Sequence, residues 1–200
     1  AAHAFGLCGL YFVVSGDMGN GLVFLFIFIC MAFVAGFALR WFALLLGGGA
    51  AAVIAAWNLD LMPSYMKDRF IVLFDHSYEP LDAGWQQTRS IMAIGSGGLT
   101  GMGYLQGPQT QSKYKTSLPA RETDEIFAVC GEEFGLVGCV LLLLLLSLII
   151  LRCIWVAKRA RSLQSALIAM GFAGMLLAQV AVNVGMCLYI FPVVGLTLPF

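Results

Sequence analysis

The sequence carries little charge, with acidic and basic residues together making up only 11% of its 200 residues. A soluble domain usually carries about 25%. Hydrophobic residues account for 60% of the chain, and this balance excludes a water-soluble fold. The few charges are also segregated, because ten of the eleven acidic residues lie between Asp60 and Glu133. These features predict a membrane-embedded chain with one water-exposed segment.

The sequence also lacks the patterns of a metal or disulfide site. Its two histidines, His3 and His76, are far apart, and no two cysteines form a CxxC pair. The cysteines stand singly in or beside apolar runs, as small packing residues do: Cys8, Cys30, Cys130, Cys139, Cys153 and Cys187. We therefore expect no metal-ligating residues. The chain begins inside an apolar run without a cleavage site, so we expect it to be part of a longer protein.

Long apolar runs, by contrast, are abundant. A helix needs about 20 apolar residues to cross the hydrocarbon core of a bilayer, and its backbone groups must be bonded internally. Five runs meet this description in whole or in part: residues 1–14, 22–39, 42–57, 134–151 and 163–190. They predict an all-α polytopic membrane protein, a transmembrane helix bundle with one long, partly helical extracellular loop. Its parts are spans in 1–57, the loop in 58–133, and two spans with the start of an extracellular turn in 134–200.

The basic residues predict the orientation of these spans. Short loops rich in Lys and Arg favour the cytoplasmic side of the membrane. The turn between the last two spans holds four basic residues and no acid: Arg152, Lys158, Arg159 and Arg161. Arg40 stands alone in the turn between the second and third spans. Both turns are expected in the cytoplasm, which places residues 58–133 outside.

The middle of the expected outside loop, residues 91–103, is apolar and glycine-rich rather than polar. It predicts a short helix or re-entrant turn lying against the membrane domain. Its glycines lack the GKS or GKT ending of a phosphate-binding loop and follow no strand, so they are not interpreted as a nucleotide site. Close backbone packing, or a bend at the membrane surface, is the favoured interpretation.

Acidic residues gather just before the fourth predicted span, residues 134–151: Glu122, Asp124, Glu125, Glu132 and Glu133. Acids in the first turn of a helix are favoured by its dipole, so ordinary capping competes here with catalysis. At about 100° per residue, Asp124 and Glu132 point in different directions, and only some of these acids can share one site. In the last span, Gln179 and Asn183 face the same side. They favour hydrogen bonds between helices, with a substrate path as the alternative.

Four blocks of sequence together resemble the SEDS family of bacterial cell-shape, division and sporulation proteins, of RodA, FtsW and SpoVE type. They are GDMGNGLVFLFIFICMAFVAG (16–36), AGWQQTRSIMAIGSGGLTGMGYLQGPQTQ (83–111), LPARETDEIFAVCGEEFGLVG (118–138) and FPVVGLTLPF (191–200). The resemblance implies a ten-helix protein, of which this chain covers roughly the fifth to ninth helices, in the bacterial plasma membrane. It also implies a peptidoglycan glycosyltransferase that joins one lipid II to the 4-hydroxyl of another and releases undecaprenyl diphosphate. A lipid II flippase and a non-catalytic scaffold for a penicillin-binding protein are the alternatives.

The resemblance assigns the catalytic role to Asp124, which occupies the aspartate position of the family's TDF motif. A sugar hydroxyl needs a base within hydrogen-bond reach, which a carboxylate at the outer surface would supply. Substrate-binding candidates for the diphosphate are the basic residues Arg89, Lys113, Lys115 and Arg121, with a divalent cation (Mg²⁺ or Mn²⁺) as a further candidate. The implied partners are lipid II, a class B penicillin-binding protein and membrane lipids, and no nucleic acid. Glu125 departs from the family, which has an aromatic residue there.

Overall fold

The computed structural model describes residues 18–75, 84–111 and 118–199. Six helices make up the described architecture, and no strand occurs in these three ranges. The helices are α2 (Met18–Val34), α3 (Leu39–Asn58), α4 (Ser64–Phe74), α5 (Trp85–Gly97), α6 (Ile126–Arg159) and α7 (Leu163–Cys187). The predicted all-α fold is confirmed.

The apolar runs correspond to helices of membrane-spanning character. Helices α3, α6 and α7 are long and apolar enough to cross a membrane, and α2 is a shorter apolar helix. The predicted span 22–39 is too long at its end, because α2 stops at Val34 and Gly36 follows with a φ of 82°. The predicted span 1–14 lies outside the described residues. Helix α6 begins at Ile126, well before the predicted residue 134.

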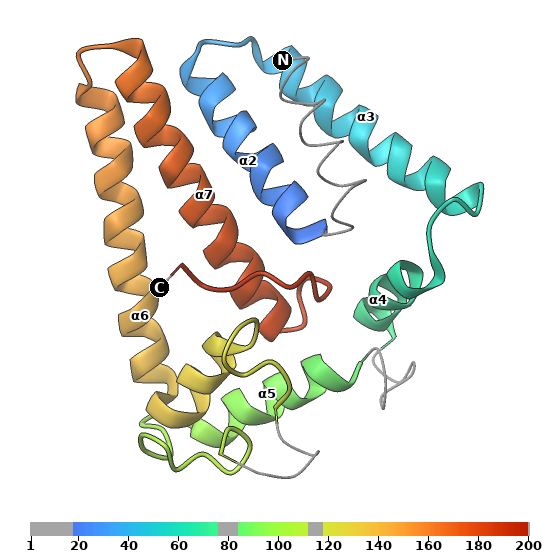
Figure 1. The fold of residues 1–200 in the computed structure, drawn as a ribbon, viewed down its shortest axis with the longest axis vertical. Coiled ribbons are helices and arrows are strands. Elements are labelled where there is room, and N and C mark those ends of the chain that lie inside the picture. The colour runs from blue at the N-terminus through green and yellow to red at the C-terminus, as the bar shows by residue number, and fades with distance from the viewer. Residues whose placement is uncertain (1–17, 76–83, 112–117, 200) are drawn as a thin grey trace.

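Helix α7 is the centre of the bundle, since it packs against both α6 and α2. Figure 1 shows these three helices side by side, with α3 leaning away from them. Small residues allow α2 to approach closely: a Cβ at Gly174 would lie 2.9 Å from the Cys30 sulfur. Helix α3 has no buried residue within the described chain. The compact part of the molecule is therefore α2, α5, α6 and α7.

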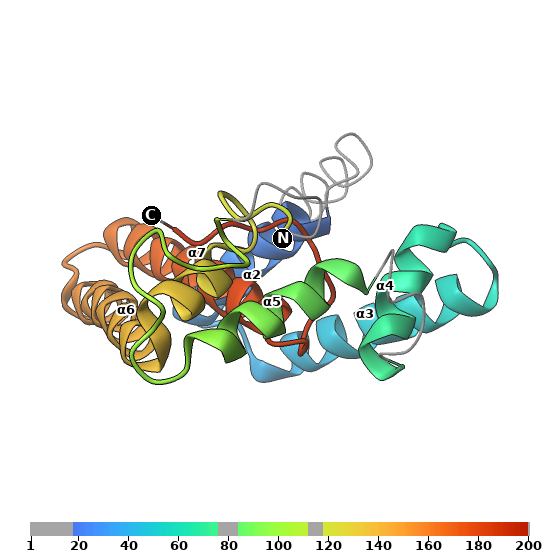
Figure 2. The same cartoon turned by 90° about the horizontal axis from the view of Figure 1, so that it is seen from below.

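Helix α5 lies across one end of this bundle and packs on α6 and α7, as Figure 2 shows from below. Gln87, Ser90, Ala93 and Gly97 form its buried face. A Cβ at Gly97 would lie 1.9 Å from the carbonyl oxygen of Gly131, so only glycine fits between the two backbones. The predicted short helix against the membrane domain is confirmed.

Helix α6 is broken at Gly135, where φ is 66° and ψ is −167°. In an unbroken helix, the carbonyls of Glu132 and Glu133 would accept from N–H groups four residues later. Here they accept instead from Met102 at 2.9 Å and Gly103 at 3.0 Å. The break therefore opens the backbone of α6 to a second segment of the chain.

That segment, residues 98–103, is called the glycine loop below. Its carbonyl groups also accept hydrogen bonds from the residues that follow the break. The N–H of Leu136 donates to Gly98 at 2.9 Å and that of Val137 to Leu99 at 3.1 Å. A Cβ at Gly101 would lie 2.2 Å from the Glu133 carbonyl oxygen. The glycine loop is thus bonded into the broken helix on both sides, and the prediction of close backbone packing is confirmed.

Candidate active site

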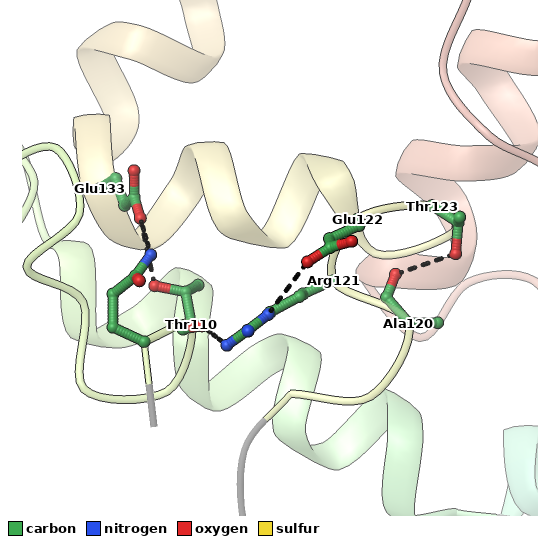
Figure 3. Close-up of polar contacts among 7 residues, drawn as sticks. Thr110, Ala120, Arg121, Glu122, Thr123 and Glu133 are labelled. Atoms are coloured by element: carbon green, nitrogen blue, oxygen red, sulfur yellow. Dashed lines mark hydrogen bonds and ion pairs between the residues drawn. The ribbon is translucent and has the colours of Figure 1, made fainter. Parts of the chain in front are cut away.

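Asp124 lies in a tight turn directly before α6. The carbonyl of Ala120 accepts three hydrogen bonds there: the N–H groups of Thr123 (3.0 Å) and Glu125 (3.1 Å) and the Thr123 hydroxyl (3.2 Å). Figure 3 shows the Thr123 side chain folded back onto Ala120. Ala120 has a φ of 49°, in the left-handed region that non-glycine residues avoid. The turn leaves Asp124 only partly buried.

Three segments meet at Asp124. The side chain of Asn183, on α7, donates from Nδ2 to the carbonyl oxygen of Asp124 at 2.8 Å and to that of Leu196 at 2.6 Å. A Cβ placed on Gly195 would lie 3.7 Å from Asp124 Oδ2, so the carboxylate faces the C-terminal segment. Asn183 is fully buried. These bonds to neighbouring backbone favour the structural interpretation of Asn183 over a substrate path.

Glu125, the departure from the family motif, is completely buried beside the candidate base. Its Oε1 accepts from Gln86 Nε2 at 3.0 Å, and its Oε2 accepts from Cys187 Sγ at 3.2 Å. Burial raises the pKa of this carboxyl, hydrogen bonds from Ser90, Cys187 and Gln86 oppose that rise, and the Asp124 charge adds to it. The net effect at Glu125, between α5 and α7, is a pKa above the ordinary carboxyl value.

Replacement of Glu125 by Gln is expected to stabilise the protein at neutral and alkaline pH. Because the folded-state pKa lies above the ordinary value of 4.5, the folded form retains the proton that the unfolded chain gives up. The resulting stability penalty is absent below about pH 4.5 and grows as pH rises toward the folded-state pKa. Gln cannot ionise, so the excess stability of Glu125→Gln should be absent below about pH 4.5 and should increase as the pH rises above it. Thermal unfolding in detergent across pH measures this.

Glu122→Gln is the control for this prediction, because the Glu122 side chain is 86% exposed in the same turn. It should leave the dependence of stability on pH unchanged. An advantage of Glu125→Gln that grew toward acidic pH would contradict the assignment of a raised pKa.

The other two acids, Glu132 and Glu133, hold the loop 107–111. Both are buried. Glu132 accepts the backbone N–H groups of Gln109 and Thr110, each at 2.8 Å. Glu133 accepts from the Gln111 amide at 3.0 Å and the Thr110 hydroxyl at 3.3 Å. Glu132 also accepts from the Ser96 hydroxyl on α5 at 3.3 Å. The two side chains thus hold neighbouring segments in place, which separates them in role from Asp124.

Arg121 belongs to the turn that holds Asp124, and Arg89 lies on α5. Arg121 donates to the carbonyl of Thr110 and approaches Glu122 at 4.0 Å, as Figure 3 shows, and its side chain is 38% exposed. Arg89 stacks over the Trp85 ring at 4.1 Å, one helical turn after Gln86. The other two basic candidates, Lys113 and Lys115, lie outside the described residues.

The acidic residues do not converge on a common point. In the ranges that the structure describes, no three His, Cys, Asp or Glu side chains form a group that would hold a metal ion. Mg²⁺ is usually bound through one or two carboxylates together with substrate phosphates. A divalent cation therefore stays a prediction, and the described residues offer no cage of protein ligands for it.

Sequence reasoning missed two residues that hold α5 against the end of α7, Gln87 and Ser90. Both are buried on α5. They donate to the last two residues of α7, Gln87 to Met186 (3.3 Å) and Ser90 to Cys187 (3.1 Å), and Gln87 also donates to Phe191 (2.8 Å), beyond the helix. They satisfy acceptors that a helix end leaves unpaired. The available signal was their three-residue spacing, on the same helical face as Ala93 and Gly97.

Comparison with known proteins places this arrangement in a family. Residues 2–200 match the family model for FtsW, RodA and SpoVE, described as a cell cycle protein. The chain belongs to this family. The match covers nearly every residue, including the Asp124 turn, the glycine loop and the C-terminal segment. The resemblance seen in the sequence is confirmed. Together with the three long apolar helices, this identifies the chain as part of a membrane protein.

The FtsW/RodA/SpoVE relatives include proteins of known name. Peptidoglycan glycosyltransferase MrdB of Escherichia coli K12 is 39% identical over 183 residues, 92% of this chain and 48% of that protein. Stage V sporulation protein E of Bacillus subtilis 168 is 36% identical over 191 residues, 96% of this chain and 50% of that protein. The chain thus spans about half the length of the curated relatives it matches.

A solved structure confirms the fold of this FtsW/RodA/SpoVE chain. The structure is described as "Structural coordination of polymerization and crosslinking by a peptidoglycan synthase complex". One of its chains matches with a TM-score of 0.74 and 34% sequence identity, over 98% of this chain and 52% of the other.

Proposed function

We propose that the complete protein is a peptidoglycan glycosyltransferase that polymerises lipid II, with Asp124 as its general base. The relative MrdB carries the name peptidoglycan glycosyltransferase. The observation that carries the proposal is the Asp124 turn: a partly exposed carboxylate whose backbone is held by α7 and whose side chain faces the C-terminal segment. Such a group is positioned to meet a substrate while its own peptide stays fixed.

The proposed reaction transfers one proton to Asp124 and one electron pair to the leaving diphosphate. Asp124 takes the proton of the acceptor 4-hydroxyl as that oxygen bonds to C1 of the donor sugar. The bond from C1 to the phosphate oxygen breaks, and undecaprenyl diphosphate leaves with its electron pair. In this proposal the growing negative charge is stabilised by basic residues. Of the candidates, Arg121 lies in the Asp124 turn and Arg89 on α5.

The flippase alternative is less well supported by the described helices. A flippase needs polar or charged groups along a path inside the bundle. Residues 134–151 and 163–187 contain no charge. The buried amide of Asn183 is already bonded to two backbone carbonyls. A scaffold role is compatible with catalysis, because the similar solved chain comes from a complex of polymerization and crosslinking. We therefore include a class B penicillin-binding protein as partner.

The proposed location is the bacterial plasma membrane, with several spans and with Asp124 on the outer side. Helix α6 carries the site at its beginning and Lys158 and Arg159 in its last turn. Near that end, Arg152 and Arg159 stack on Trp155 at 4.2 and 4.4 Å. Tryptophan is enriched at both membrane interfaces, and an excess of Lys and Arg marks the cytoplasmic one. The opposite end of α6, where Asp124 lies, then faces outward, in contact with lipid II and membrane lipids.

The proposal is tested with purified full-length protein and labelled lipid II. Formation of glycan strands, separated by gel electrophoresis, supports a polymerase. Movement of labelled lipid II across vesicle membranes without strand formation would support the flippase instead. Absence of both activities, together with stimulation of a crosslinking partner, would support the scaffold.

Replacing Lys113, Lys115 and Arg121 together by Gln is expected to weaken the use of lipid II. Exposed charge pairs contribute about 0.2–1 kcal/mol each, so each change should raise the half-saturating lipid II concentration by roughly 1.4- to 5-fold at low salt. Added salt should reduce the difference between variant and wild type. Lys158→Gln, at the other end of α6, is the matched control. An unchanged half-saturating concentration in the triple variant would remove these residues from the binding site.

A further inference from the structure

We infer that Asn183 is a positioning residue for Asp124, holding the base and the C-terminal segment in one fixed arrangement. This inference rests on the proposed function, because it assigns Asn183 a role in placing the general base. The two bonds of its amide reach Asp124 O at 2.8 Å and Leu196 O at 2.6 Å. Those acceptors are 59 and 13 residues away along the chain, so one side chain bonds to two segments that are distant in the sequence.

The orientation of the Asn183 amide is set by the two carbonyl groups to which its Nδ2 donates. An asparagine amide has two N–H groups on one atom and two lone pairs on the other. Both described bonds use Nδ2, whereas Oδ1 is buried without a partner among the described residues. Turning the amide over would point its oxygen at two carbonyl oxygens, which repel it. The site therefore requires a double donor at this place on α7.

The two carbonyls that Asn183 holds belong to the immediate surroundings of the carboxylate. One is the carbonyl of Asp124 itself. The other belongs to Leu196, which follows Gly195. A Cβ placed on Gly195 would lie 3.7 Å from Asp124 Oδ2, and Gly195 has a φ of 68°. One amide thus fixes the distance between the base and the backbone that its side chain faces. A displacement of about 1 Å in such a group can lower a rate about 10²-fold.

The chain offers a matched control in Gln87. This residue is also a fully buried amide that donates from one nitrogen to two carbonyls, those of Met186 and Phe191. It contacts neither the Asp124 peptide nor the segment 194–196 in any described hydrogen bond. Asn183→Leu and Gln87→Met each remove a buried double donor and keep the side-chain size. The two variants should lose similar thermal stability, which separates folding from positioning.

The experiment measures strand formation and thermal unfolding for full-length wild type, Asn183→Leu and Gln87→Met. Asn183→Leu is expected to lower kcat about 10²-fold with little change in the half-saturating lipid II concentration, whereas Gln87→Met keeps kcat within a few-fold. Equal losses of kcat at equal losses of thermal stability would overturn the positioning role. So would a normal kcat in Asn183→Leu.

Asn183→Asp keeps the inference testable if the Leu variant does not fold. Its ionised carboxylate has no donor for the two carbonyls, whereas its protonated form has one. The kcat of Asn183→Asp relative to wild type should therefore rise as pH falls, and a ratio independent of pH would overturn the role. If strand formation depends on Asp124 but not on residue 183, only the positioning role of Asn183 is refuted. If wild type forms no strands, the proposed function is refuted as well.

Discussion

Asp124→Asn in the full-length protein is expected to abolish glycan-strand synthesis, with a loss of about 10²- to 10⁴-fold in rate. Asparagine keeps the size of the side chain and removes the proton acceptor. The backbone carbonyl of residue 124 can still accept from Asn183, because that bond does not involve the side chain. Expression, membrane insertion and thermal stability should therefore stay close to wild type. Strand formation from labelled lipid II at saturating concentration measures the loss.

Glu122→Gln is the matched control for this prediction. It removes a carboxylate of the same turn whose side chain is 86% exposed and whose ion-pair partner, Arg121, lies at 4.0 Å. It should retain most of the activity. Near-normal synthesis by Asp124→Asn would refute the general-base assignment and place the flippase and scaffold interpretations ahead of the polymerase.

Gly97→Ala is expected to destabilise the protein by about 1–3 kcal/mol or more, because the added methyl group meets backbone rather than a movable side chain. A Cβ there would lie 1.9 Å from Gly131 O and 2.9 Å from the Cα of Glu132. Relief requires α5 to move away from α6, which also disturbs the Gln86 bond to Glu125. Thermal unfolding in detergent should show a lower midpoint, and strand synthesis should fall with it.

Gly95→Ala supplies the comparison on the same helix, since a Cβ at Gly95 has nothing within 4 Å. Alanine is favoured over glycine within a helix by up to about 1 kcal/mol, so this variant should be as stable as wild type or slightly more stable. Equal effects of the two substitutions would show that the approach of α5 to α6 is looser than described.

The sequence predicted the membrane helices well because hydropathy is a local property. The runs 134–151 and 163–190 lie in α6 and α7, with errors mainly at the ends. The start of α6 was missed since residues 126–133 contain two acids, Glu132 and Glu133, which usually indicate exposure. Their burial depends on donors from the loop 107–111, far away in the sequence. A local pattern does not report such partners.

The candidate site was predicted in its chemistry but not in its geometry. Asp124 was identified from its motif and from the need for a base at the outer surface. The bond that holds its peptide comes from Asn183, 59 residues later, and depends on how α7 packs. Glu125 was recognised as a departure from the family, yet its complete burial between Gln86 and Cys187 follows only from the crossing of α5 beneath α7.

The break at Gly135 has a consequence for biogenesis. After the break, α6 is an ordinary apolar helix that can enter lipid with its hydrogen bonds already made. Before it, the carbonyls of Glu132 and Glu133 are satisfied only when Met102 and Gly103 are in place. The glycine loop precedes α6 in the sequence and is therefore synthesised first. Its bonds to residues 132–137 can form only after this part of α6 has been made, so the loop docks onto the helix as a late step of folding.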